Sequence, residues 1–156
     1  MDIITKSHFE DFKQQYGYHS LTESDVFELF CIYCIASKYI KQESITKEML
    51  DDIKIGNGGD WGIDGLFVVV NGQVVFTVDV VDDLLKANGS LAVQIVAIQA
   101  KTSSSFNVAE LGQTLDGAQN ILKDILGATL FPKCNEDLVN YRSLIKHIYE
   151  NCAHFK

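Results

Sequence analysis

Three polar side chains, Asp64, Gln99 and Lys101, stand beside stretches of the sequence that are otherwise typical of β-strands. Strand side chains alternate between the two faces of a sheet, so Gln99 and Lys101 should share one face while Ala100 points to the other. If the strand that starts near Asp64 lies beside this one, a carboxylate, an amide oxygen and an ammonium group come together. Such a patch suits a hydrated Mg²⁺ or Mn²⁺ ion and a phosphate group.

This chemistry gives each group a role. Mg²⁺ usually binds one or two carboxylates together with water and substrate phosphate, so Asp64 is expected to anchor the ion. The side-chain oxygen of Gln99 and the backbone carbonyl of Ala100 could complete the protein's ligands. Lys101 would orient or deprotonate the attacking water and stabilise charge on the phosphate. Each residue also has a structural interpretation: Asp64 in a turn or cap, Gln99 as a polar strand-end residue, and Lys101 as a solvated terminus.

Further polar residues could contribute to the same site. Glu28 is the only charged residue in the apolar stretch 26–36, and an ionised carboxylate among apolar neighbours is costly unless a metal or cation meets it. Glu28 is therefore a candidate catalytic residue and metal ligand, the alternative being a side chain that reaches the surface. Asp60 is a competing metal ligand in a glycine-rich loop. Gln113 and Ser103 are candidates for substrate binding, although an exposed position on a helix would also explain Gln113.

The N-terminal part of the sequence predicts helices and a loop. The capping box Ser20–Glu23 indicates a helix that runs to about Ile40 and is buried on most sides. Thr46 is the expected N-cap of a second, short helix. The segment 56–62 contains four glycines and predicts a turn-rich loop.

The middle of the sequence predicts a β-meander. The runs 63–70 and 73–80 flank Asn71-Gly72, which is the strongest short signal for a hairpin. Leu91–Ala100 is expected to form a third strand. If the first and third of these runs lie near each other, the segments carrying Asp64 and Lys101 are close in space.

Two helices are expected after the meander. The first starts at a capping box from Asn107 to Glu110 and stops at Gly127, with apolar residues at helical spacing. The second covers about 135–152, starting at Asn135, and places six residues on one face, namely Leu138, Tyr141, Leu144, Ile145, Ile148 and Cys152. It shows no C-cap signal, which favours a further downstream region. The order of elements predicts one α/β domain over residues 1–156, with a mixed sheet.

The segment Gly62-Ile-Asp-Gly65, the hairpin and Gln99-Ala-Lys101 together resemble the PD-(D/E)xK nuclease superfamily, in its Mrr-like variant with glutamine at the second acidic position. The serines and Phe106 after Lys101 extend the resemblance towards the N-terminal domain of AIPR (abortive infection phage resistance) proteins. The resemblance covers a core of about residues 20–125.

This resemblance implies a restriction-endonuclease-like α/β fold: a four-stranded mixed β-sheet flanked by helices on both faces. It also implies a Mg²⁺ cofactor and a nucleic-acid substrate. Many members place a glutamate on the first helix, and Glu28 matches that position. Two departures are visible: Gln99 removes one negative charge from the site, and Ile63 stands where the superfamily name has proline.

The charge balance disfavours tight binding of nucleic acid by this chain alone. The chain has 13 Lys and Arg against 21 Asp and Glu, and its formal net charge is −8. Nucleic-acid affinity depends mainly on cationic side chains that meet phosphates. The missing positive charge could come from further domains or from a second subunit in a homodimer.

The four cysteines and the apolar runs limit the cellular context. Zinc binding by cysteines would need Cys31 and Cys34 to meet the distant Cys134 and Cys152, so we expect buried, reduced thiols instead. No apolar stretch reaches the roughly 20 residues that span a bilayer, and no signal peptide opens the chain. A cytoplasmic protein without membrane partners is expected.

The sequence therefore predicts a Mg²⁺-dependent nuclease domain that hydrolyses phosphodiester bonds, of DNA rather than RNA, in defence against phage. Two alternatives stay open. One is a non-catalytic module that keeps the nuclease-like fold for protein association or dimerisation. The other is an unrelated α/β domain in which the motif match arose by chance.

Overall fold

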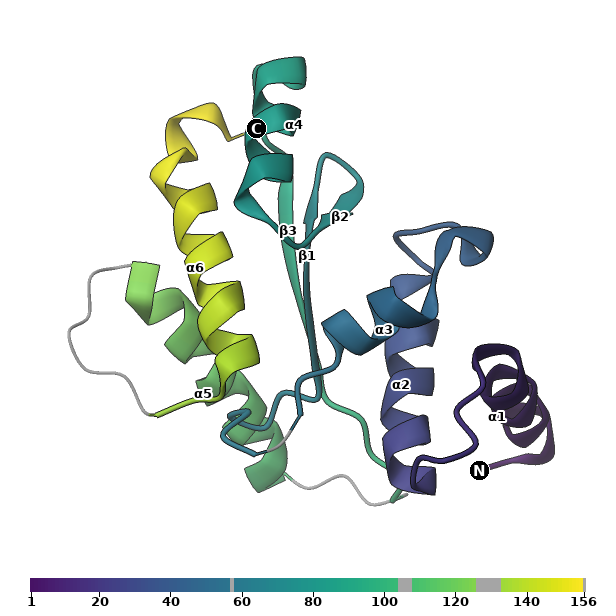
Figure 1. Cartoon of the computed structure of the whole chain (residues 1–156). Coiled ribbons are helices and arrows are strands. Elements are labelled where there is room, and N and C mark those ends of the chain that lie inside the picture. The colour runs from purple at the N-terminus through teal and green to yellow at the C-terminus, as the bar shows by residue number, and fades with distance from the viewer. Residues whose placement is uncertain (57, 104–107, 126–132, 156) are drawn as a thin grey trace.

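The computed structural model describes residues 1–56, 58–103, 108–125 and 133–155 (Figure 1). Its α-helices are α1 (Ile3–Tyr16), α2 (Glu23–Ala36), α3 (Lys47–Ile53), α4 (Val78–Asn88), α5 (Val108–Ile125) and α6 (Glu136–Glu150). Short 3₁₀ helices cover Gln42–Ser44 and Cys152–His154, and the strands are β1 (Gly65–Val70), β2 (Gln73–Val75) and β3 (Val93–Ile98).

The strands form a sheet in the order β2-β1-β3, with both pairs antiparallel. The α/β class is confirmed. The mixed sheet was wrong, because within the described ranges each strand pair runs antiparallel. The four strands implied by the resemblance are also not matched there, since the described residues form three strands.

The central strand β1 separates two apolar cores. Leu66, Val68 and Val70 pack towards α4, α5 and α6, whereas Phe67 and Val69 pack towards α1, α2 and α3. Alternate side chains of a strand point to opposite faces, and all six residues of β1 are buried. The expected helices on both faces are thus confirmed, and Figure 1 shows β1 and β3 between α2 and α3 on one side and α5 and α6 on the other.

Helix α2 is largely buried, as its apolar sequence predicts. It begins two residues later than expected, because Thr22 and not Ser20 is the N-cap, its side chain accepting a hydrogen bond from the amide of Asp25. The helix ends at Ala36, and Tyr39 and Ile40 lie beyond it. Its core face meets an aromatic cluster from α1 that includes Phe9 and Phe12.

The predicted hairpin turn is confirmed, but the strand after it is shorter than expected. Asn71 and Gly72 both have positive φ, at 51° and 83°, which is the backbone that a two-residue hairpin requires. The predicted strand 73–80 ends at Val75, because Val78 starts helix α4. Valine favours strands, but the core-facing residues Val81, Leu84 and Leu85 recur at helical spacing, and burial of that face stabilises the helix.

The C-terminal layer contains α5 and α6. The N-cap of α6 is Asn135, as predicted, and the five described residues of its predicted apolar face are buried. The helix does not run to the end of the sequence, because it ends at Glu150 with Asn151 as C-cap. The expected cap and stop of α5, Asn107 and Gly127, lie outside the described residues, as does Phe106. Within the described ranges, no helix is both long and apolar enough to cross a membrane.

Candidate active site

Asp64 lies just before β1 and is fixed by hydrogen bonds on both sides. Its amide donates to the carbonyl of Ile98 at 2.8 Å, and its own carbonyl accepts from the amide of Ile55 at 2.9 Å. One carboxylate oxygen, Oδ2, accepts a hydrogen bond from the amide of Ala100 at 2.6 Å. The first and third predicted strands are therefore neighbours, and the segment just after β3 holds the Asp64 carboxylate through the backbone of Ala100.

The backbone contact between Ile55 and Asp64 also brings Lys54 to the site. Lys54 forms an isolated antiparallel bridge with Gly65, next to Asp64. Its ammonium nitrogen lies 3.0 Å from Glu28 Oε2 and 2.6 Å from Asp25 Oδ1. Burial lowers the pKa of Lys54, but the hydrogen bonds to Asp25 and Glu28 outweigh burial and raise it. The cation expected to accompany Glu28 is thus a lysine from the segment after α3.

Gly65 allows helix α2 to approach this corner. A Cβ atom on Gly65 would lie 2.8 Å from Cγ1 of the fully buried Ile32. Ile32 follows Glu28 by one turn of α2, so close packing at Gly65 sets the distance between Glu28 and the start of β1.

These residues line an acidic cleft of about 500 Å³. Its charged side chains are Asp25, Glu28, Asp51, Lys54, Asp60, Asp64 and Asp137. Six carboxylates thus face one ammonium group among the described lining residues. Burial, together with the negative charges of Glu28 and Asp60, raises the pKa of Asp64 despite its hydrogen bond to Ala100. A cation in the cleft would relieve this repulsion.

The glycine-rich loop presents Asp60 to the cleft. The carboxylate of Asp60 accepts a hydrogen bond from the amide of Gly62 at 2.8 Å. Two helices hold the loop: Thr114 of α5 donates to the carbonyl of Gly62 at 2.8 Å, and the side chain of Asn135 donates to the carbonyl of Gly56 at 2.7 Å. Asp60, a competing ligand in the sequence analysis, therefore lies on the same cleft as Asp64.

The residues after β3 lie differently from Asp64 and Glu28. Gln99 and Ala100 are partly buried beyond the end of β3. Lys101 pairs with Glu110 of α5 and lines a separate cavity beside α1 and the start of α2. Neither Gln99 nor Lys101 is among the described residues that line the acidic cleft.

The two candidates for substrate binding are exposed. Gln113 lies on α5 with its Cβ near Gly62. Ser103 follows Lys101 on the surface. The structure thus brings Asp64, Glu28 and Asp60 together on the cleft, whereas Lys101, Gln113 and Ser103 are not among the described residues that line it.

The sequence analysis missed Lys54 and Asp25. A signal for Lys54 was present, because it stands between Ile53 and Ile55, which are both buried. A lysine between two core residues has to place its charge at the edge of the core, where a carboxylate can meet it. Asp25 reads from sequence only as an acidic residue in the first turn of a helix.

The donor set fits a hydrated, oxygen-binding cation better than a fully caged one. Among the described residues, no three His, Cys, Asp or Glu side chains lie close enough together to hold one metal ion. Mg²⁺ commonly takes one or two carboxylates and keeps water in its other positions. Asp64 with Glu28 or Asp60 would supply such a pair.

A thiol borders the cleft on the side of α2. Burial, followed by the neighbouring Cys34, Asp64 and Glu28, raises the pKa of Cys31 to about 11, so this thiol stays neutral. Cys31 and Cys134 are partly buried free cysteines, whereas Cys34 is exposed, contrary to the expectation of buried thiols.

Comparison with known protein families, with curated proteins and with solved structures gives no match. The functional interpretation therefore depends on the residues and geometry of this chain.

Proposed function

We propose that the acidic cleft binds Mg²⁺ or Mn²⁺ and hydrolyses phosphodiester bonds of a nucleic acid, DNA in preference to RNA. The observation that supports this proposal most directly is the excess of carboxylates around Asp64, whose pKa is raised by burial and by Glu28 and Asp60. A half-buried carboxylate beside two like charges is unfavourable for folding alone. It is favourable for holding a divalent cation.

The chain's own groups have separate tasks in this proposal. Asp64 is the fixed ligand, because the Ala100 amide orients its carboxylate. Glu28 and Asp60 complete the negative pocket from α2 and from the glycine-rich loop. A bound divalent cation would supply Lewis-acid stabilisation of charge at the phosphate.

Two lysines are candidates for stabilising the phosphate. Lys101 was predicted from the sequence, and its ion pair with Glu110 keeps it near the end of β3. Lys54 lies in the cleft itself and is held by Asp25 and Glu28. Lys54 is the stronger candidate on geometry, because it lines the cleft and Lys101 lines a separate cavity. The two lysines can be separated by mutation.

The experiment is a cleavage assay on single-stranded DNA, duplex DNA and RNA, with Mg²⁺, Mn²⁺ or EDTA. The proposal expects cleavage that depends on the metal and is lost in Asp64→Asn. Asp116→Asn is the matched control, because Asp116 is an exposed carboxylate on α5. Loss of cleavage in Lys54→Met but not in Lys101→Ala would assign the phosphate contact to Lys54, and the reverse would assign it to Lys101. Cleavage that persists in Asp64→Asn contradicts the proposed site.

One observation favours a second function, a dimerisation or protein-interaction module. Helix α5 exposes several of its apolar residues, since Val108 is 77%, Leu115 61% and Leu122 40% exposed. These residues recur every seven positions, which is the spacing of helices that pair side by side. Sedimentation of the native chain and of Leu115→Glu distinguishes the two: a dimer that the variant dissociates supports this second function.

A further inference from the structure

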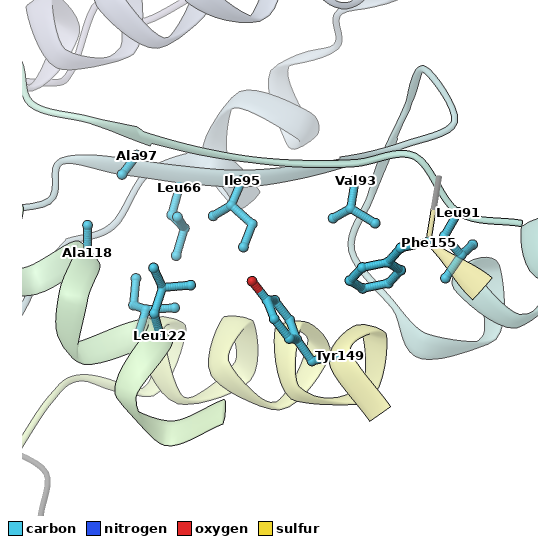
Figure 2. A pocket seen from close by; sticks show the side chains of 10 residues that line it. Leu66, Leu91, Val93, Ile95, Ala97, Ala118, Leu122, Tyr149 and Phe155 are labelled. Carbon is cyan, nitrogen blue, oxygen red and sulfur yellow. The ribbon is translucent and has the colours of Figure 1, made fainter. Parts of the chain in front are cut away.

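A partly open apolar cavity lies on the other side of the sheet from α2, between β1, β3, α5 and α6. Its volume is about 420 Å³. Ligand pockets in proteins measure roughly 300 to 1,000 Å³ and are lined mainly by apolar side chains with a few placed polar groups. Figure 2 shows its wall of hydrocarbon side chains, which includes Leu66, Ile95 and Ala97 from the strands and Ala118 and Leu122 from α5.

Tyr149 is the exception in this wall. Its hydroxyl points from α6 into the cavity, towards Ile95 (Figure 2). The ring is held against Phe155 in an edge-on contact, with centroids 5.6 Å apart. Phe155 is itself fixed by a bridge to Leu91, whose amide donates to the carbonyl of His154 at 2.8 Å. The tyrosine is therefore oriented by packing, and its hydroxyl is directed at space and not at a neighbouring polar group in the lining.

The chemistry of the lining defines what fits. All lining residues other than Tyr149 have hydrocarbon side chains, so these side chains offer nothing to replace the water that an ion loses on entering the cavity. The formal net charge of −8 further disfavours an anion. The hydroxyl of Tyr149 can donate one hydrogen bond to an oxygen.

We propose that this cavity is a binding site for a neutral, mainly hydrocarbon molecule that carries one carbonyl or ether oxygen, with Tyr149 as the hydrogen-bond donor. This site is independent of the proposed nuclease function, because the cavity and the acidic cleft share no lining residue among those described.

The test uses camphor, a compact ketone, and benzene, which has no polar atom, as probes for the native chain followed by NMR. Both probes should give saturable shifts of the methyl resonances of Ala97, Ala118 and Leu122. Tyr149→Phe should weaken camphor binding by about fivefold, which corresponds to one net hydrogen bond of about 1 kcal/mol. It should leave the affinity for benzene unchanged.

A second variant fills the cavity from the helix. The side chain of Ala118 points from α5 towards the sheet (Figure 2), so Ala118→Leu should raise the melting temperature and abolish the shifts from both probes. Two results would overturn the proposal. One is the absence of saturable shifts at these methyl groups with either probe. The other is an equal loss of camphor and benzene affinity in Tyr149→Phe.

Discussion

The ionised carboxylate of Asp64 is unfavourable for folding at its position. The residue is fixed by backbone hydrogen bonds from two directions, yet its carboxylate lies near Glu28 and Asp60. Burial and these neighbours favour its neutral form. Because the folded-state pKa is raised above the ordinary 3.8, the contribution of Asp64 to stability is largest below that value and is lost as pH rises through the folded pKa.

Replacement of Asp64 by asparagine should therefore stabilise the metal-free protein at neutral pH. The amide keeps an oxygen that can accept from Ala100 and removes the charge. Urea unfolding in EDTA between pH 3 and 8 should show little difference between Asp64→Asn and the native chain at the acid end. The variant should gain a growing advantage as pH rises, whereas Asp116→Asn should not. A difference that is constant with pH, or one that favours the native chain at pH 7, would contradict this.

Lys54 is the compensating charge of the cleft, and its loss should be costly. Its side chain is 18% exposed and that of Glu28 is 26% exposed. Lys54→Met should lower the free energy of unfolding by about 1–2 kcal/mol, between the values for exposed and for buried ion pairs. Lys86→Met removes the exposed ion pair with Asp83 and should cost close to nothing. Equal effects in urea unfolding would show that Lys54 is only a surface lysine.

At this scale the sequence predicted half of the arrangement. Glu28 was identifiable because a single charge in an apolar helix needs a partner. Asp64 was identifiable from its place at the start of a strand. Lys54 was not identified as the partner, because the bridge between Lys54 and Gly65 joins segments on either side of the glycine-rich loop. The neighbouring isoleucines mark Lys54 as a lysine at the edge of the core, but nothing local in the sequence shows which carboxylates it meets.

Among the elements, α5 and the glycine-rich loop depend on each other. A Cβ atom on Gly117 would lie 2.5 Å from the carbonyl oxygen of Trp61, so the helix approaches the loop that carries Asp60 only because this residue is glycine. Backbone atoms have little room to move, in contrast to the end of a flexible side chain.

A pair of glycine variants in the same helix tests this contact. Gly117→Ala should lower the free energy of unfolding by about 1–3 kcal/mol through overpacking. Gly112→Ala should raise it by up to about 1 kcal/mol, because alanine favours helix and, beyond the helix's own backbone, no atom of the described residues lies within 4 Å of the added Cβ. Thermal or urea unfolding measures both. Opposite signs are expected, and stabilisation by both variants would mean that α5 does not press against the loop.

The secondary structure was predicted correctly where a local interaction determines it. The prediction failed where burial against distant parts of the chain determines it. The hairpin turn needs positive φ at two successive residues, which Asn71 and Gly72 adopt more readily than most residues. Thr46 and Asn135 cap helices with their own side chains. In contrast, α4 is rich in valine and is helical because one of its faces meets the core. The exposed apolar residues of α5 show the same limit. Their spacing predicts a helix, but it does not predict which parts of the protein cover that helix.

For the whole molecule, the layers of helices on both sides of the sheet can be predicted from β1, because its side chains point alternately to the two faces. The directions of the paired strands cannot be predicted in this way. The residues on both faces of β1 are apolar, which predicts that both faces are covered. This pattern does not show whether the neighbouring strands run parallel or antiparallel to β1. With a net charge of −8, the proposed function requires that substrate affinity depend on a cation bound in the cleft. High salt should therefore weaken nucleic-acid binding only modestly, compared with proteins that bind through basic surfaces.

The most direct test of the central claim is thermal unfolding during a titration with Mg²⁺ or Mn²⁺, for the native chain, Asp64→Asn and Asp116→Asn. A ligand that binds only the folded state stabilises it by about 2.7 kcal/mol at a hundred times its dissociation constant. The native chain and Asp116→Asn should show a saturable rise in melting temperature, and Asp64→Asn should show none. Equal stabilisation of all three proteins, or no stabilisation of any, would contradict a cation site at Asp64.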